Sequence, residues 1–248
     1  MVDRAFGDAS LAGLYDALNP WGAGEAFYLE LVLGASAVLD VGCGTGVLLR
    51  CAREAGHGGR LCGLDPAAAM LVQARRRAPA VEWVLGDLVS ARGRWDGGFD
   101  LATMTGHAFQ VLISDAEIRT ALAAVREMLA PGGHFVFETR NPAARAWEQW
   151  TPDRVRDITD AEGRPVRVWH EVETPVSGEL VTFAETFEGP AWPRPQISHS
   201  TLRFLGAEAV AGFVREAGLV VQAQYGDWDR RPMSATGPEI ITVAQRID

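Results

Sequence analysis

The sequence contains no lysine, and its charges lean to the acidic side. All 23 basic residues of the 248-residue chain are arginines, against 32 acidic residues, which gives a formal net charge of −9. Proteins that hold the phosphate backbone of DNA or RNA usually carry an excess of basic side chains. We therefore expect no nucleic-acid partner and favour a small-molecule ligand.

Cysteine is also scarce, and the cysteines that occur do not form a recognisable site. Cys43, Cys51 and Cys62 are odd in number and lack the spacing of metal ligands. No pattern pairs them with a histidine or an aspartate as a catalytic partner. We expect packing residues in a reduced, cytoplasmic protein without a metal site.

Long hydrophobic runs are missing as well. No stretch reaches membrane-spanning length, and the N-terminal residues lack the basic start and apolar core of a secretion signal. Apolar residues nevertheless make up 48% of the chain, which is ordinary for a globular protein with a sizeable core. We expect no membrane partner, and a monomer or homodimer.

Short apolar runs alternate with helical periodicity from about residue 27 to 137. The runs are AVLDV, RLCGLD, VEWVLGD, FDLATMT and HFVFET, an alternation typical of a parallel sheet with crossover helices. The same pattern resumes near the C-terminus, where 210–217 forms a helix face and 219–224 and 240–244 indicate two further strands. We predict an α/β fold with a doubly wound, mostly parallel seven-stranded sheet.

The segment between the fourth and fifth runs is predicted to be an amphipathic helix. Ser114 and Glu117 form a capping box at its start, and Pro131 with the following glycines is expected to end it. Its apolar face recurs at helical spacing in Ile118, Leu122, Val125 and Leu129.

Residues 141–205 break the alternation and predict an antiparallel β lid inserted after the fifth strand. Period-two runs flank Pro175-Val176-Ser177-Gly178, which indicates a hairpin, with ISHSTLRFL as a possible third strand. Open α/β sheets bind ligands at the edge above which this insertion lies. We divide the chain into an N-terminal helical segment covering the ligand site (1–34), an α/β core (35–140 and 206–248) and a lid or substrate-binding subdomain (141–205).

The string DVGCGTG directly after the first predicted strand is the clearest motif. Gly42, Gly44 and Gly46 let the chain turn sharply and let a ligand approach the backbone, with the N-terminus of the next helix directed at it. Nicotinamide-dependent enzymes use a similar loop, but their third glycine comes one place later, where this chain has Val47.

This spacing, with Asp40 two residues before the first glycine, resembles motif I of the class I S-adenosylmethionine-dependent methyltransferases. The resemblance covers roughly residues 38–141 and weakly the remainder. It implies the Rossmann-like seven-stranded fold of that family, the methyl donor S-adenosyl-L-methionine, and the product S-adenosyl-L-homocysteine.

Two further acids fit this donor. Asp65 ends the second predicted strand, where a carboxylate can accept both ribose hydroxyls, although it can also cap a helix that starts at Pro66. Asp87 ends the third, where the family places an acid or amide near the adenine, although alone it is typical of a turn. The resemblance implies a donor site made of Tyr15, Asp40, Gly42, Cys43, Gly44, Gly46, Asp65, Pro66, Met70, Gly86, Asp87, Leu88, Met104 and Thr105.

Two N-terminal aromatic residues can also act on the donor. Such residues frequently fold over it in this family, and an aromatic face attracts a sulfonium by ~0.5–2 kcal/mol. Tyr15 can take this role or pack on the sheet, whereas we expect Trp21 to pack the N-terminal segment on the sheet.

His107, which follows the fourth predicted strand, is the candidate catalytic residue. A neutral imidazole can take a proton from a hydroxyl or ammonium near pH 7, although this ring can also contact the donor or simply pack. Other acceptor-side candidates are Arg140, Asn141, His170, His199 and Arg203. Four tryptophans of the insertion form either an apolar acceptor pocket or the core of the lid, namely Trp147, Trp150, Trp169 and Trp192.

These observations together predict an enzyme that methylates a small molecule at oxygen or nitrogen. The alternatives are a nicotinamide-dependent oxidoreductase and a protein that binds S-adenosylmethionine without transferring its methyl group. A nucleic-acid or protein methyltransferase is disfavoured by the acidic charge and by the lack of an added recognition domain.

Overall fold

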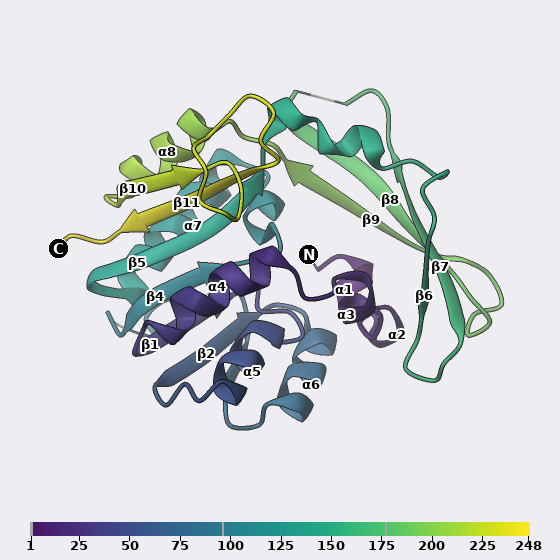
Figure 1. Ribbon diagram of the computed structural model, residues 1–248, viewed down its shortest axis with the longest axis horizontal. Helices are drawn as coiled ribbons and strands as arrows, with labels where there is room; N and C mark the ends of the chain where they lie inside the picture. Colours follow the sequence, from purple (N-terminus) through teal and green to yellow (C-terminus); the bar gives the residue numbers. More distant parts are fainter. Residues whose placement is uncertain (1, 96, 177) are drawn as a thin grey trace.

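The chain folds into a seven-stranded sheet with helices on both faces and a separate four-stranded sheet to one side (Figure 1). This computed structural model describes residues 2–95, 97–176 and 178–248. The large sheet has the strand order β10-β11-β5-β4-β1-β2-β3. Its strands are β1 (Ala37–Val41), β2 (Arg60–Asp65), β3 (Glu82–Leu85), β4 (Phe99–Met104), β5 (Leu129–Arg140), β10 (Val220–Tyr225) and β11 (Glu239–Gln245).

Neighbouring strands of the large sheet are parallel except at β11, which runs antiparallel to both β5 and β10. The chain order reverses between β1 and β4, because β2 and β3 lie on one side and β5 on the other. Open α/β sheets bind ligands outside the carboxyl ends of the strands at such a reversal. The predicted fold class is confirmed.

Two hydrophobic layers hold the helices to the sheet. Side chains alternate along β1, so Val38 and Leu39 point to opposite faces. Val38 lies in the core under α4 (Ala23–Leu33) and α5 (Val47–Glu54), and Leu39 in the core under α7 (Asp115–Met128) and α8 (Ala207–Glu216). Helix α6 (Ala68–Arg77) packs through Leu71 against Trp83 of β3. None of the helices in the described part of the chain has the length and apolar character needed to span a membrane.

Helix α7 begins as predicted but ends earlier. The Ser114 hydroxyl accepts a hydrogen bond from the Glu117 N–H and the Glu117 carboxylate accepts one from the Ser114 N–H, which confirms the capping box. The helix ends at Met128, because Leu129 already belongs to β5 and pairs with Phe99 of β4. The prediction that Leu129 lies on the helix and that the following proline ends it is wrong, since strand pairing overrides the local periodicity.

The insertion forms the small sheet. Its strands are β6 (Arg156–Thr159), β7 (Pro165–Val172), β8 (Leu180–Glu188) and β9 (Gln196–Arg203), each antiparallel to the next. The predicted hairpin and third strand are confirmed as β7, β8 and β9, while Ser177 of the predicted turn lies outside the described residues. Strand β6 was not predicted, because its four residues RDIT are mostly exposed and show no apolar pattern.

Short N-terminal helices join the small sheet to the core of the molecule (Figure 1). They are α1 (Arg4–Gly7), α2 (Ala9–Ala12) and α3 (Tyr15–Leu18). Leu11 and Leu14 pack against Val168 of the small sheet, while Tyr15 packs against Met70 of α6. The N-terminal segment therefore packs against both the small sheet and helix α6 of the core.

Candidate active site

The glycine loop connects the end of β1 to the start of α5. Its glycines at 44 and 46 have φ angles of +53° and +74°. The Gly44 N–H donates to the Asp65 carboxylate at the end of β2 (2.8 Å). A Cβ added at Gly46 would lie 2.3 Å from the Trp83 ring, whereas one added at Gly44 would meet only Tyr15, at 4.0 Å. Gly46 is therefore required because a side chain there would clash with the Trp83 ring. The absence of a side chain at Gly44 leaves space above the loop.

A cavity of about 370 Å³ opens above this loop at the carboxyl edge of the sheet. Its volume suits a small-molecule ligand. The predicted residues that line it are Tyr15, Asp40, Gly42, Cys43, Gly44, Thr105, His107 and Arg140. Residues that were not predicted complete the wall, among them Glu25, Tyr28, Glu138, Trp228 and Glu239.

Asp40, the last but one residue of β1, lines this cavity. It is 1% exposed, and its carboxylate accepts a hydrogen bond from the Thr103 hydroxyl of β4 (2.9 Å). Burial raises the pKa of Asp40 to about 7. A cationic ligand in the cavity would stabilise the ionised form of this buried carboxyl group, because a nearby positive charge favours that form.

Asp65 lies behind the glycine loop and does not line the cavity. One carboxylate oxygen accepts from the Gly44 N–H and the other from the Ala67 N–H (2.7 Å). Helix α6 begins at Ala68 with Ala67 as its N-cap, and Pro66 is exposed. The alternative in which Asp65 caps a helix starting at Pro66 is therefore wrong in position, while its contact with the donor ribose stays a prediction.

The residues predicted near the adenine, Asp87 and Leu88, and three further predicted donor residues do not line the cavity. Asp87 is exposed, and its carboxylate accepts from the Ser90 N–H (2.8 Å), which is the turn role considered for it. Leu88 and Met104 are buried in the core under α7, and Met70 is buried beneath the N-terminal helices. The donor contacts of these residues, and of Gly86 beside Asp87, stay predictions.

Tyr15 closes the cavity from the N-terminal segment. A Cβ added at Gly106, after β4, would lie 3.2 Å from its hydroxyl, so the ring lies between the loops that follow β1 and β4. The next residue, Asp16, fixes this placement by accepting a hydrogen bond from the Thr45 hydroxyl (2.6 Å) and pairing with Arg77. Trp21 is 43% exposed, so the packing expected for it is not observed.

His107 follows β4 in the wall of the cavity and is held by two carboxylates. Its φ is +60°, in the left-handed region, and its backbone N–H donates to Glu138 of β5 (2.7 Å). Its Nε2 lies 2.9 Å from Oε2 of Glu239 on β11, with the two side chains 18% and 12% exposed. Burial lowers the pKa of His107 to about 4 and raises the pKa of Glu239 to about 7.

Glu138 and Glu239 were not predicted as site residues. Glu138 is 1% exposed and also accepts a hydrogen bond from the Tyr28 hydroxyl of α4. A buried carboxyl needs such partners, so the glutamate within the run HFVFET was a usable signal. Glu239 could not be found in this way, because only the antiparallel direction of β11 brings its first residue to the carboxyl edge of the sheet.

Most of the other acceptor-side candidates serve the fold. The Asn141 amide donates to the carbonyls of Ser234 and Gly237, which ties β5 to the loop before β11. Arg203 pairs with Asp115 and Glu179. His170 and His199 pair within the small sheet and do not line the cavity.

The tryptophans of the insertion do not line the cavity, and three of them contact other side chains of the protein. Trp147 packs on Phe204, with ring centroids 4.6 Å apart, and Trp150 packs on Phe183 at 4.8 Å. Trp192 donates to the Ser10 hydroxyl of α2, and Trp169 lies within β7. Of the two interpretations of these residues, the packing role is favoured.

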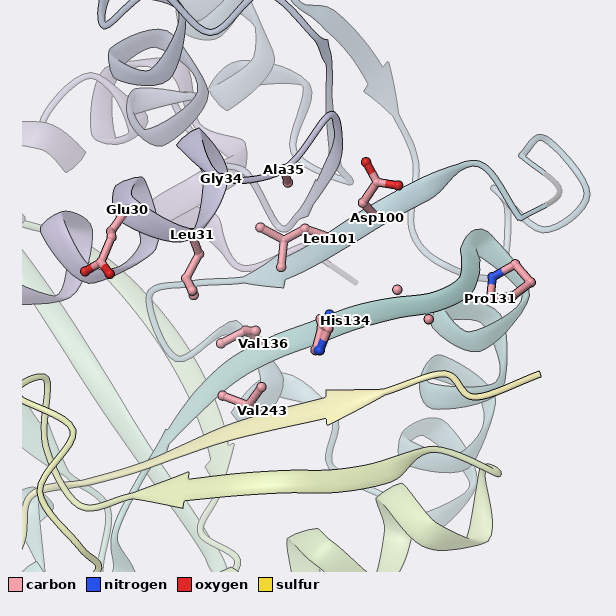
Figure 2. Close-up of a pocket in the computed structure, with 12 residues that line it drawn as sticks. Glu30, Leu31, Gly34, Ala35, Asp100, Leu101, Pro131, His134, Val136 and Val243 are labelled. Carbon is pink, nitrogen blue, oxygen red and sulfur yellow. The ribbon is translucent and has the colours of Figure 1, made fainter.

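Figure 2 shows a larger cavity, of about 570 Å³, beside the start of β5. It is lined by apolar side chains such as Leu31, Leu101 and Val243, and by Asp100. The Asp100 carboxylate accepts the backbone N–H groups of Ser36 and Ala37 at the start of β1, so it serves the fold. This cavity lies at the amino end of β4, far from the glycine loop. The candidate active site is therefore the smaller cavity above the glycine loop.

Comparison with known proteins places the site in a family. A family model for a methyltransferase domain matches residues 38–133. The chain is 36% identical to a 2-phytyl-1,4-naphtoquinone methyltransferase from Thermosynechococcus vestitus over 56% of this chain and 66% of the relative. It is 30% identical to the protein of that name from Trichormus variabilis over 58% of this chain and 69% of the relative. The chain thus spans about two thirds of the length of these relatives.

A solved structure matches nearly the whole chain, including the small sheet. It is an amino pentose methyltransferase from Micromonospora echinaspora with S-adenosylmethionine bound, 27% identical, with a TM-score of 0.69 over 94% of this chain and 96% of that protein. The matched segment contains motif I and the ends of β2 and β3, in the order that the family requires. The chain belongs to the class I S-adenosylmethionine-dependent methyltransferases, whose methyl donor is S-adenosylmethionine.

Proposed function

We propose that this chain transfers the methyl group of S-adenosylmethionine to an oxygen or nitrogen atom of a small molecule and releases S-adenosylhomocysteine. The observation that carries the proposal is that His107, paired with Glu239, lines the same cavity as the glycine loop. The net charge of −9 argues against a nucleic-acid acceptor. The amino pentose methyltransferase, matched across the lid as well as the core, supports a small acceptor.

The residues present fit the donor. Gly44 leaves the space above the loop open, and Tyr15 faces that space from the other side. Both carboxylate oxygens of Asp65 already accept one N–H, and each retains a second lone pair for a ribose hydroxyl. The donor supplies an electrophilic methyl group on a sulfonium. The role of the chain is mainly to orient the reactants, which can contribute ~7–11 kcal/mol of the barrier.

We propose that His107 accepts the proton of the acceptor nucleophile. When Nε2–H donates to Glu239, the lone pair of Nδ1 is free to accept a proton. The pKa of about 4 keeps the ring neutral at neutral pH, and the Glu239 carboxylate stabilises the imidazolium as it forms. General base catalysis contributes ~10²–10⁴-fold and is most effective when the pKa of the base lies near the working pH, so a ring with a pKa of about 4 is expected at the lower end of this range.

Calorimetric titration and a methyl-transfer screen test the proposal. We expect S-adenosylhomocysteine to bind and NADH not to bind, and the reverse result would restore the nicotinamide alternative. Methyl transfer to members of a small-molecule library is expected, and tight product binding without any transfer would favour the non-catalytic alternative. We expect His107→Ala to lower turnover more than donor affinity, whereas equal losses would make His107 a binding residue only.

The division into N-terminal segment, core and lid, the cytoplasmic location and the monomeric or homodimeric state remain parts of the proposal. Light scattering of the purified chain at several concentrations tests the last of these. A stable assembly larger than a dimer would contradict it.

A further inference from the structure

Arg140 is the basic side chain with a permanent charge among the residues that line the cavity. It ends β5, and on the neighbouring strand β11 it lies directly opposite Glu239. The remaining ionisable groups of the wall include the carboxyl groups of Glu25, Asp40, Glu138 and Glu239. Among the described residues of the wall, Arg140 is therefore the permanent cation that an anionic group entering this cavity meets.

The Arg140 guanidinium is held on one edge by a neutral partner. Nη1 donates to Oε1 of Gln110 (3.1 Å), which also accepts the Arg140 backbone N–H (3.2 Å). The Gln110 amide nitrogen donates to the Arg203 carbonyl, so the glutamine is itself anchored. The carbon of the guanidinium lies 5.4 Å from the centroid of the Trp150 ring. These contacts fix the guanidinium in place without neutralising it.

No carboxylate of the described residues lies in ion-pair contact with Arg140. Glu239 is engaged by the His107 ring, and Glu138 by the Tyr28 hydroxyl and the His107 N–H. Arg203, at the edge of the lid, shows the usual arrangement for a mostly buried arginine here, because it pairs with two carboxylates. Glu138 and Glu239 act on Arg140 through their charges without touching it. A partly buried cation without a direct carboxylate contact is costly, and the remaining N–H groups of Arg140 are available to a ligand.

We propose that Arg140 binds a carboxylate of a bound ligand through the edge of its guanidinium that Gln110 leaves free. A planar guanidinium matches a carboxylate in a two-point contact that lysine cannot make. The carboxylate can come from the methionine part of the donor or from the acceptor. The inference rests on the proposed use of this cavity for methyl transfer, but binding measurements test it even if no transfer is found.

The donor arm compares S-adenosylhomocysteine with 5′-methylthioadenosine, which lacks the amino-acid part. If the donor supplies the carboxylate, Arg140→Gln lowers the affinity for S-adenosylhomocysteine roughly tenfold or more. The affinity for 5′-methylthioadenosine stays unchanged. Arg140→Lys recovers only part of the loss, because it keeps the charge without the two-point contact. Arg145→Gln, at an exposed arginine paired with Glu148, is the matched control and changes neither affinity.

The acceptor arm titrates the protein saturated with S-adenosylhomocysteine with benzoate and N-acetylglycine, each against its amide. If the acceptor supplies the carboxylate, the wild type prefers the carboxylates and Arg140→Gln loses this preference while its affinity for S-adenosylhomocysteine is unchanged. The proposal is overturned if neither arm responds to Arg140→Gln. It is also overturned if Arg140→Gln lowers the affinities for S-adenosylhomocysteine and 5′-methylthioadenosine equally, because Arg140 then acts through the fold of the cavity.

Discussion

Removing the charge of Glu239 is expected to slow methyl transfer without weakening the binding of the donor. The His107 ring lies 2.9 Å from Glu239 in a site where both side chains are largely buried. Hydrogen bonds to charged groups contribute ~1.5–3 kcal/mol, and each ~1.4 kcal/mol in a barrier changes the rate about tenfold. Glu239→Gln keeps the shape of the side chain but cannot stabilise the imidazolium. We expect turnover to fall roughly 10- to 150-fold with the affinity for S-adenosylhomocysteine almost unchanged.

The pH dependence of turnover provides a second measurement of the same pair. Burial raises the pKa of Glu239 to about 7, so its stabilising charge develops as the pH rises through about 7. The His107 ring, with a pKa of about 4, stays neutral throughout that range. Wild-type turnover should therefore rise through about pH 7, and Glu239→Gln should lack this rise.

The assay uses an acceptor from the screen and a saturating donor, because the pKa of Asp40 is also about 7 and can affect donor binding. His107→Ala serves as the comparison, and adding Glu239→Gln to it should cause little further loss. Full turnover in Glu239→Gln, or a rise with pH that persists in it, would refute the assignment of Glu239 as the partner of His107.

Three further predictions concern the donor side. Asp65→Ala should weaken S-adenosylhomocysteine more than about tenfold in calorimetric titration, because the ribose hydroxyls lose their acceptor, and an unchanged affinity would remove Asp65 from the site. Gly46→Ala should lower the free energy of unfolding in urea by about 2–4 kcal/mol, since its Cβ meets Trp83 at a positive φ, and wild-type stability would show that this ring can move. Burial raises the pKa of Asp40 from 3.8 to about 7, so its contribution to stability is complete below about pH 4 and is lost as the pH rises through about 7. Asp40→Asn should therefore unfold at a higher temperature than the wild type at about pH 8 while binding the donor more weakly, and equal melting temperatures would contradict the raised pKa.

The parts of the fold that follow local patterns could be predicted from the sequence. The runs AVLDV and RLCGLD became β1 and β2 at the predicted residues, and the Ser114 capping box begins α7. Errors arose where distant contacts decide the outcome. Leu129 continues the helical periodicity, yet it pairs with Phe99 and belongs to β5. Residues 156–159 form strand β6 because they pair with β7, which their own sequence does not indicate.

The same distinction applies to the candidate site. The glycine loop, Tyr15 and His107 could be found because each follows or precedes a recognisable element of the sequence. Glu239 could not, because its partner His107 is 132 residues away and the direction of β11 was not predicted. Arg140 was predicted as one candidate among several, and only the structure shows that it lacks the ion pairs that Arg203 has.

The N-terminal helices have a consequence for the order of events during turnover. They place Tyr15 over the glycine loop, and the leucines of the same helices complete the apolar core of the small sheet. Donor and product are bulky, so we expect their exchange to require these helices to separate from α6 or from the sheet. Uncovering each buried leucine costs about 1.5–3 kcal/mol. Separation of these helices is therefore expected to precede the release of S-adenosylhomocysteine in every catalytic cycle.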